Sequence, residues 1–424
     1  MKQKVALPYG QKQVTVEFDS ASLMGIYSPK DVPGVSDQGA EISRALAHPI
    51  GSAPLRELAQ GKKKVVLVAD DNTRLTPTDI IIPPLLNELN AAGVPDSAIT
   101  VVIALGTHRF MTDEEILAKF GDEVVRRVAV KNHPYKDPAY LVDLGQTPNG
   151  TFISINREVY EADFKIGIGS IVPHHIPGYA GGAKIVQPGV SGEATTAETH
   201  LLSVREKRSY LGIVDNPVRR ELNSIARKIG MHTIFNTVLN RHGQMVKAFF
   251  GDLEAAFLAG VEASQDVYAV EMPAEADIVL ASSHPCDLEF WQSHKTLYPA
   301  DRAVRQGGIM IVVTPCYEGV AVTHGEMVEY AGLPPSQVKA MLDRGEIEDA
   351  VAAALAIAWG QVRERGQVYF VSEGVSPEEA RKLGFTPFAS VQEALDAAFR
   401  TLGSNAKLAV LTHAPDMLPV IRNK

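Results

Sequence analysis

The sequence predicts an α/β protein of two domains, each with a mainly parallel sheet flanked by helices, and an active site in the cleft between them. Its 424 residues exceed the length at which a single hydrophobic core usually stops growing. Short apolar runs bounded by turn residues alternate with helical patterns, as in parallel sheets that helices cover on both faces. Apolar residues make up 45% of the chain and charged residues 21%, which is ordinary for a globular protein.

The first half of the chain contains three apolar runs that indicate buried strands, together with two well-marked helices. Residues 78–93 ("TDIIIPPLLNELNAAG") have a helical pattern that ends at a glycine. Thr112 followed by Glu115 is the pattern of a capping box, which predicts the start of another helix. The predicted strands are Lys63–Asp70, Ala98–Gly106 and Ala162–Ser170.

The second half repeats this alternation and predicts a second sheet. Ser376, Pro377 and Glu379 place a capping side chain, a first-turn proline and a returning carboxylate where a helix should begin. Before this half, residues 231–251 have the pattern of a hairpin that turns at His242-Gly243. The stretch "EMPAEAD" around Pro273 is the most linker-like, so we predict domains of residues 1–272 and 273–424. The predicted strands are Ala276–Ser283, Gly308–Pro315, Gln367–Gly374 and Lys407–Ala414.

Charge and composition exclude several classes of protein. A net charge of -9 and a pI near 5.8 oppose binding to nucleic acid, and no basic stripe is present beyond "GKKK". The two cysteines, Cys286 and Cys316, are too few for a disulfide framework and lack metal-ligand spacing, which suits a reducing compartment. The start of the chain lacks the apolar core of a signal peptide, and no run approaches a membrane span. We therefore expect a cytoplasmic protein that binds neither nucleic acid nor membrane.

Polar side chains follow the predicted strands of the first half, at the edge of a parallel sheet where ligands usually bind. Asp71 and Arg74 follow the first strand in "ADDNTRLTP", and the planar guanidinium of Arg74 is suited to a carboxylate. His108 follows the second strand in "GTHRF". Structural alternatives are an Asx-turn or helix cap for the aspartates and a hydrogen-bonded structural role for the histidine.

A third cluster, "IVPHHIPGYAGGAKIVQPG", places His174, His175 and Lys184 after the third strand, with His200 on a following helix pattern. The Walker A motif fails here because Ala183 precedes the lysine, and "GIGSIV" lacks the third glycine of a dinucleotide fingerprint. What remains is a lysine that could bond covalently to a cofactor. The imidazoles could bind a borderline metal or transfer protons, although each residue alone could also be structural.

A fourth cluster lies in the second half, in "EFWQSHKTLYP". On a helix Gln292 and Lys295 are three residues apart and point the same way, while Trp291 precedes them and His294 lies between them. A solvated helix face is the structural alternative. If the two domains face each other, this cluster closes on the first three.

These motifs carry a family resemblance. In order and spacing, "DDNTR", "GTHR", "PHHIPGYAGGAKIVQPG", "ETH" and "WQSHK" resemble the nickel-dependent lactate racemase family over nearly the whole chain. Members are 2-hydroxy acid racemases and epimerases that use a nickel-pincer nucleotide, the pyridinium-3,5-bisthiocarboxylic acid mononucleotide of nickel. The resemblance implies that Lys184 bonds covalently to this cofactor and that His200 is the protein ligand to the nickel. It makes residues 1–272 the cofactor-binding and catalytic domain.

The resemblance also implies a reaction and roles for the other residues. Hydride would leave C2 of a small 2-hydroxy acid for the pyridinium ring and return to the opposite face. His108 and His174 would be the acid/base pair, with His175 as the open alternative to the latter. Trp291 stands where lactate-specific members have tyrosine, so a lactate-like acid and a sugar acid both remain possible substrates. The implied cofactor-binding residues further include Asp71, Gln292 and Lys295, and the implied substrate-binding residues are Arg74, Lys295 and Trp291.

Two other functions stay open at this stage. The glycine-rich loop could bind phosphate in a nucleotide-dependent transferase, with Lys184 as a point charge. The chain could also be a cofactor carrier or ligand-binding protein without turnover. The resemblance further implies transient contact with proteins that build the cofactor and insert nickel, and it predicts no oligomeric state.

Overall fold

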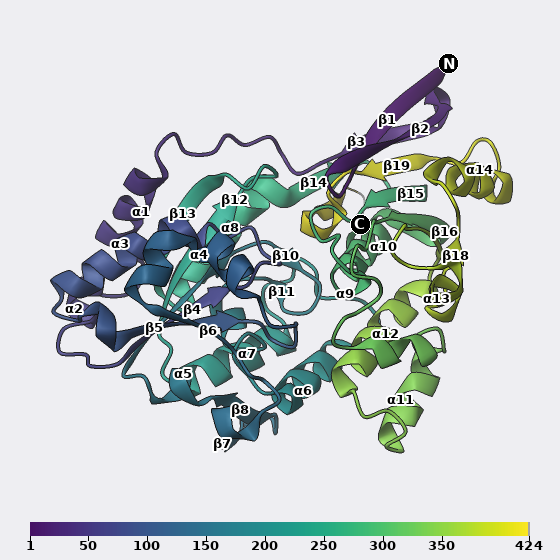
Figure 1. Cartoon of the computed structure of the whole chain (residues 1–424). Helices are drawn as coiled ribbons and strands as arrows, with labels where there is room; N and C mark the ends of the chain where they lie inside the picture. The colour runs from purple at the N-terminus through teal and green to yellow at the C-terminus, as the bar shows by residue number, and fades with distance from the viewer. Residues whose placement is uncertain (423–424) are drawn as a thin grey trace.

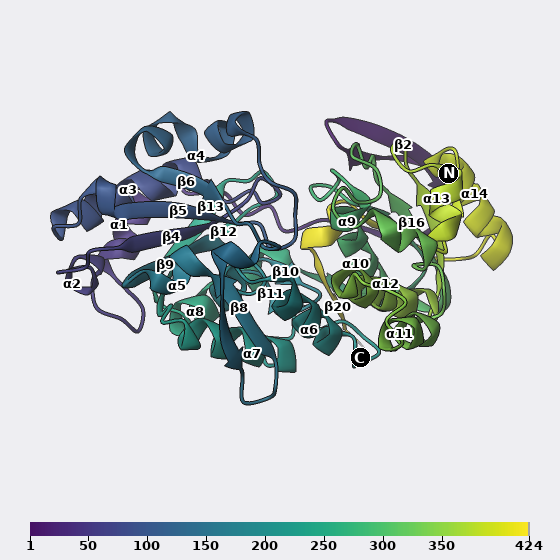
Figure 2. The same ribbon diagram turned by 60° about the horizontal axis from the view of Figure 1, so that its bottom comes forward.

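The computed structural model of the chain describes residues 1–422 and has two lobes side by side (Figure 1, Figure 2). The first lobe contains a six-stranded sheet in the order β13-β12-β9-β4-β5-β6. Neighbouring strands are parallel except for the antiparallel pair of β12 and β13. The strands are β4 (Val65–Asp70), β5 (Ile99–Ala104), β6 (Ala129–Asn132), β9 (Phe164–Ser170), β12 (Thr233–Leu239) and β13 (Met245–Asp252).

The first sheet is buried on both faces, as the continuous apolar runs predict. Along β4, Val65, Leu67 and Ala69 pack into the core beneath one layer of helices, while Val66 and Val68 face the opposite layer. This alternation is the two-residue period of a strand with helices on both sides. The first layer is α1 (Gln38–Ala47), α3 (Thr78–Ala91) and α4 (Asp113–Arg127), and the second includes α7 (Pro217–Lys228) and α8 (Ala255–Tyr268).

The second lobe contains another six-stranded sheet, in the order β18-β17-β16-β15-β19-β3. All of its pairs are parallel. Helices α10 (Leu297–Ala303) and α12 (Ala350–Arg363) cover one face, and α14 (Val391–Leu402) covers the other. The strands are β3 (Leu23–Tyr27), β15 (Ala276–Ser282), β16 (Val304–Val313), β17 (Gln367–Val371), β18 (Thr386–Pro387) and β19 (Leu408–Leu411).

The predicted fold class and all seven predicted strands are confirmed. β16 begins at Val304 rather than Gly308, because its first residue pairs with Ala276 across an irregularity in the ladder. Both capping boxes form, at Thr112 for α4 and at Ser376 for α13 (Pro377–Lys382). The predicted hairpin is the antiparallel pair of β12 and β13.

The start of the chain departs from the predicted division into residues 1–272 and 273–424. Strands β1 (Lys2–Tyr9) and β2 (Lys12–Asp19) form a hairpin, and β3 pairs in parallel with β19 at the edge of the second sheet. Val5 and Leu7 are buried in the same apolar cluster as Ile278 and Leu280 of β15. These segments therefore lie with the second lobe, because β3 forms an edge of its sheet and the β1–β2 hairpin packs, together with α14, on one face of that sheet.

A continuous apolar core joins the two lobes. It runs from β4 of the first lobe to α12 of the second, and α6 (Glu193–Ser203) packs against α12 at the junction (Figure 2). The two lobes are therefore packed against each other at the base of the cleft. Within residues 1–422, no helix has the length and apolar character needed to cross a membrane.

Candidate active site

All nine predicted site residues line a single cavity between the lobes. The first lobe supplies residues from the carboxyl ends of β4, β5 and β9 and from the loop and helix that follow, while the second supplies α9 (Phe290–Ser293) and the turn after it. The cavity has an empty volume of about 1000 Å³, counted with its open mouth. Its predicted lining residues are Asp71, Arg74, His108, His174, Lys184, His200, Trp291, Gln292 and Lys295.

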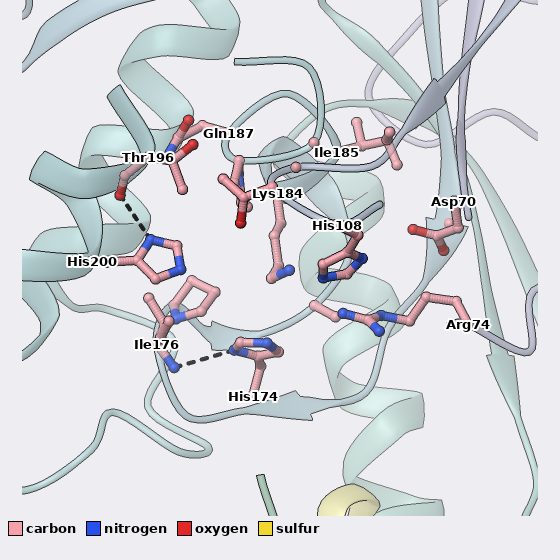
Figure 3. A pocket seen from close by; sticks show the side chains of 18 of the residues that line it. Asp70, Arg74, His108, His174, Ile176, Lys184, Ile185, Gln187, Thr196 and His200 are labelled. Atoms are coloured by element: carbon pink, nitrogen blue, oxygen red, sulfur yellow. Dashed lines mark hydrogen bonds between the residues drawn. The ribbon is translucent and has the colours of Figure 1, made fainter. Parts of the chain in front are cut away.

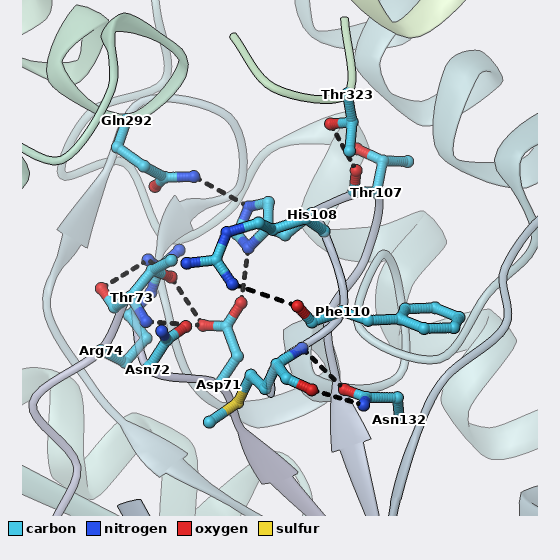
Figure 4. Close-up of polar contacts among 12 residues, drawn as sticks. Asp71, Asn72, Thr73, Arg74, Thr107, His108, Phe110, Asn132, Gln292 and Thr323 are labelled. Atoms are coloured by element: carbon cyan, nitrogen blue, oxygen red, sulfur yellow. Dashed lines mark hydrogen bonds and ion pairs between the residues drawn. The ribbon is translucent and has the colours of Figure 1, made fainter. Parts of the chain in front are cut away.

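The two ring nitrogens of His108 are bound on opposite sides, Nδ1 by the carboxylate of Asp71 and Nε2 by the amide of Gln292 (Figure 4). Its Nδ1 lies 2.6 Å from Asp71 Oδ2, and Asp71 Oδ1 accepts from the amide and hydroxyl of Thr73 at 3.1 and 2.6 Å. Burial alone would raise the pKa of Asp71, but the charge and hydrogen bond of His108 hold it well below its usual range. The ionised carboxylate fixes the proton on Nδ1, so Nε2 is left as an acceptor.

The second lobe reaches that acceptor directly. Gln292 donates its amide to His108 Nε2 at 2.9 Å, and Lys295 donates to the Gln292 carbonyl oxygen, which confirms the predicted same-side pair. Burial and then the charge of Arg74 lower the pKa of Lys295 to about 8. Arg74 donates to the carbonyl and hydroxyl of Thr73. The cavity thus holds two cations suited to a carboxylate.

Lys184 stands on a tight turn that only glycine can form. Gly181 and Gly182 have φ of 79° and 57°, and a Cβ on Gly181 would lie 2.6 Å from Ile171 Cγ1. Figure 3 shows the Lys184 amine extended into the cavity between His108, His174 and His200. Burial, followed by the charges of Arg74 and other cations, lowers its pKa well below the usual range. Among the residues described, none hydrogen-bonds its Nζ, and the lowered pKa favours the neutral, nucleophilic form of the amine.

His200 extends from α6 with one ring nitrogen fixed and the other free. Its Nδ1 lies 2.8 Å from the carbonyl oxygen of Thr196 and donates to it, so Nε2 carries the lone pair (Figure 3). Burial lowers the pKa of His200 to about 4 and keeps the ring neutral. A neutral imidazole with Nδ1–H on a backbone carbonyl is a common form of a metal-ligating histidine.

His174 and His175 occupy different positions although they are adjacent. His174 accepts from the amide of Ile176 at 3.2 Å and faces the cavity beside Arg74 (Figure 3). His175 is stacked between His174, with ring centroids 4.6 Å apart, and Tyr298, at 4.0 Å. Burial lowers the pKa of both imidazoles well below the ordinary value. Both imidazoles line the cavity, but His175 is enclosed between two rings, whereas His174, within residues 1–422, is stacked only on His175.

The sequence analysis did not identify His324, Asp349 and Thr107, which meet at the cleft. His324 is fully buried, with Nδ1 2.5 Å from Asp349 Oδ2 and Nε2 3.1 Å from Thr107 Oγ1. Its ring stacks on Trp291. These residues come from separate loops of both lobes, and no local motif joins them. Only Thr107, beside His108 in "GTHRF", carried a usable signal.

The fold and the site define a two-lobed α/β enzyme with a polar, histidine-rich cleft. Residues 9–212 match the model of the lactate racemase N-terminal domain, and residues 271–421 match that of the lactate racemase C-terminal domain. The chain is 28% identical to a lactate racemase of Thermoanaerobacterium thermosaccharolyticum and 29% identical to one of Lactiplantibacillus plantarum. Each alignment covers 98% of this chain, and 98% and 99% of the relatives.

Solved structures give the same picture. The lactate racemase apoprotein of Thermoanaerobacterium thermosaccharolyticum superposes with a TM-score of 0.89 at 27% identity, over 99% of this chain and 100% of that one. A Thermotoga maritima protein shares the fold, with a TM-score of 0.72 at 21% identity over 93% of this chain and 100% of that one. The chain belongs to the lactate racemase family and is a racemase, an isomerase of a family that needs a nickel cofactor.

Proposed function

We propose that the enzyme racemises or epimerises a small 2-hydroxy acid, lactate-like or a sugar acid, with a nickel-pincer nucleotide attached to Lys184 and its nickel ligated by His200. The observation that carries this proposal is the Lys184 amine, which burial shifts toward the neutral form and which extends, without a hydrogen-bond partner among the described residues, into the cavity. The two relatives are named for their action on lactate.

The residues present fit such a cofactor. A neutral amine can form an amide or thioamide bond, whereas an ammonium ion has no free electron pair. The free Nε2 of His200 is a borderline donor suited to nickel, and Nδ1 on Thr196 sets its tautomer and direction. Gln292 and Lys295 reach the same cavity from the second lobe. When bound, the cofactor would supply an electrophilic ring that accepts hydride from C2 of the substrate.

The histidines supply proton transfer to and from the substrate hydroxyl. His108 presents an unprotonated Nε2, and the ionised Asp71 behind it stabilises the imidazolium that forms when this nitrogen takes the proton. His174 lies across the cavity with Nδ1 accepting from a backbone amide, so its proton sits on Nε2. Two imidazoles on different walls allow proton transfer for both configurations at C2. The ring stack around His175 supports His174 as the second group.

The cations would hold the substrate carboxylate while the configuration changes. Arg74 and Lys295 approach the cavity from different lobes, so a carboxylate held between them keeps its place. Trp291, only 4% exposed, replaces a hydroxyl-bearing residue with an apolar ring on the wall of the cavity. The proposal therefore keeps both a lactate-like acid and a sugar acid as candidate substrates.

Intact-protein mass spectrometry would test the proposal. The chain, co-expressed with cofactor-building enzymes, should carry an adduct that Lys184→Arg abolishes, while His200→Ala should keep the adduct and lose nickel. Enantiopure lactate, other 2-hydroxy acids and aldonic acids would then be assayed for loss of optical purity. An adduct that survives Lys184→Arg, or a loaded enzyme that racemises none of these acids, would refute the assignment.

The proposal has two further parts. Loading of the cofactor requires transient contact with the proteins that build it and insert nickel, and a cytoplasmic location would give access to them. The phosphate-binding transferase is disfavoured because Gly182–Ile185 forms a short 3-10 turn, not the long helix whose N-terminus cradles phosphate.

A further inference from the structure

Two aspartate–histidine pairs meet across the cleft. Asp71 and His108 belong to the first lobe, and Asp349 and His324 belong to the second. In each pair Nδ1 bonds to a carboxylate and Nε2 contacts a polar side chain of the opposite lobe. His108 Nε2 accepts from Gln292 at 2.9 Å, and His324 Nε2 lies 3.1 Å from Thr107 Oγ1.

The two contacts are linked through neighbouring residues. Thr107 directly precedes His108, and Trp291 directly precedes Gln292. The His324 ring stacks on Trp291 with centroids 3.8 Å apart and planes 18° apart. Thr107 and His108 of the first lobe therefore contact Trp291 and Gln292 of the second lobe at two points. Gln292 bonds to His108 directly, and His324 contacts both Thr107 and Trp291.

His324 and Trp291 are also tied together through the backbone. The amide of Trp291 donates to the carbonyl of Val320 at 2.9 Å, and Glu289 accepts from the amide of Val322 at 2.9 Å. The loop that carries His324 is thus fixed to the start of α9. These bonds hold the loop and Trp291 together, and the loop contacts Thr107 of the first lobe through both His324 and Thr323.

We propose that His324, oriented by Asp349, is a positioning residue that keeps the Trp291 wall and the His108 loop in register when substrate displaces Gln292 from His108. This inference rests on the proposed function. A substrate hydroxyl needs His108 Nε2, which the Gln292 amide occupies in this structure. Once that bond breaks, the bond from Thr107 to His324 still joins the two lobes next to the reacting atoms.

The ionised state of Asp349 supports this role. Burial would raise the pKa of Asp349, but the hydrogen bond and charge of His324 lower it. An ionised carboxylate keeps the proton on Nδ1 of His324, so its Nε2 accepts from the Thr107 hydroxyl. His324 is completely buried, and the bonded Asp349 carboxylate is largely buried. The ring therefore has one orientation.

Steady-state kinetics of the loaded enzyme would test the proposal. His324→Phe keeps a ring against Trp291 but removes both hydrogen bonds. We expect kcat to fall about ten- to a hundredfold, the usual cost of misplacing a reacting group by an ångström. Nickel content and the Lys184 adduct should be unchanged. The matched control is Thr323→Val, which removes another bond between the lobes, from Thr323 Oγ1 to the Thr107 carbonyl at 3.0 Å. It should change kcat less than twofold.

Tryptophan fluorescence of the apoprotein gives a readout that does not need turnover. The chain has two tryptophans, and Trp359 is fully buried in the core. In the parent and in His324→Phe, acrylamide should quench neither residue strongly. In His324→Ala, Trp291 loses its stacking partner and should become accessible to the quencher.

The two readouts separate the possible failures. Equal losses of kcat in His324→Phe and Thr323→Val would mean that any bond between the lobes matters as much as that of His324, and would overturn the inference. So would a Trp291 that stays shielded in His324→Ala. If the parent itself racemises no acid, the proposed function fails first, and the quenching experiment still decides whether His324 positions Trp291.

Discussion

Replacement of Asp71 by asparagine tests how the site sets the proton on His108. Asp71 Oδ1 accepts two hydrogen bonds from Thr73, at 3.1 Å from its amide and 2.6 Å from its hydroxyl. In Asp71→Asn these donors keep the side-chain oxygen where it is, so the new amide nitrogen faces His108 Nδ1. A donor in that position forces Nδ1 to accept, and the proton moves to Nε2.

The second lobe makes this shift more damaging. Gln292 also points an N–H at Nε2, and it cannot easily turn over because Lys295 donates to its oxygen. In the variant, a proton on Nε2 would face the Gln292 N–H, so His108 would lose both its free base and its hydrogen bond to the second lobe. Loss of the correct tautomer in a comparable aspartate–histidine pair lowers kcat about 10⁴-fold, and here we expect about 10²–10⁴-fold, or about 3–5 kcal/mol of barrier.

The assay is loss of optical purity of each pure enantiomer by enzyme with matched nickel and adduct content. Asp96→Asn is the control, since Asp96 binds Arg127 outside the cavity and should leave kcat unchanged. Nitrogen NMR of the apoprotein would report the His108 tautomer directly. A fall in kcat of less than threefold in Asp71→Asn, with the proton still on Nδ1, would refute the reasoning.

Three further outcomes follow from burial and charge. The pKa of Lys295 lies at about 8, so its charge is present below that pH and lost above it; KM for an anionic substrate should rise above pH 8, and Lys295→Arg should remove that rise. Burial lowers the pKa of His133 to about 4 from an unfolded value of 6.5, so the unfolded chain binds more protons at this residue between these values. His133 should therefore account for a fall of about 3 kcal/mol in the unfolding free energy as pH drops from 6.5 to 4, and His133→Gln should make that fall smaller by this amount. Trp359→Ala empties a fully buried position and should cost about 3–5 kcal/mol in chemical denaturation, with a loss under 1 kcal/mol contradicting the packing described.

The fold could be predicted where the local signal is strong. The uninterrupted apolar run of β4 predicted a strand covered on both faces, and every residue from Val65 to Ala69 is buried. The partner of β3 could not be predicted, because Leu23–Tyr27 pairs with a strand almost 400 residues away. Pairing over such a distance depends on which sheet edge is open, and nothing in a short window records that.

The site was predicted where residues cluster along the chain. Lys184 and His174 share one glycine-rich segment, and the motifs that carried the family resemblance were local. His324 and Asp349 were not predicted as site residues, because each lies in an ordinary loop or helix cap. Their role depends on contacts with Trp291 and Thr107, which are distant in the sequence. The tautomers were likewise beyond sequence reasoning, since they depend on which atom each ring nitrogen meets.

The placement of β3 has a consequence for how the molecule is made. The second sheet needs β3, at Leu23–Tyr27, and strands that follow residue 275, so β3 has no partner until β19, at Leu408–Leu411, has been synthesised. No single cut yields two intact halves. A fragment that begins after residue 272 would expose the flank of β19 and invite self-association, and adding back the N-terminal segment as a separate peptide should restore its solubility.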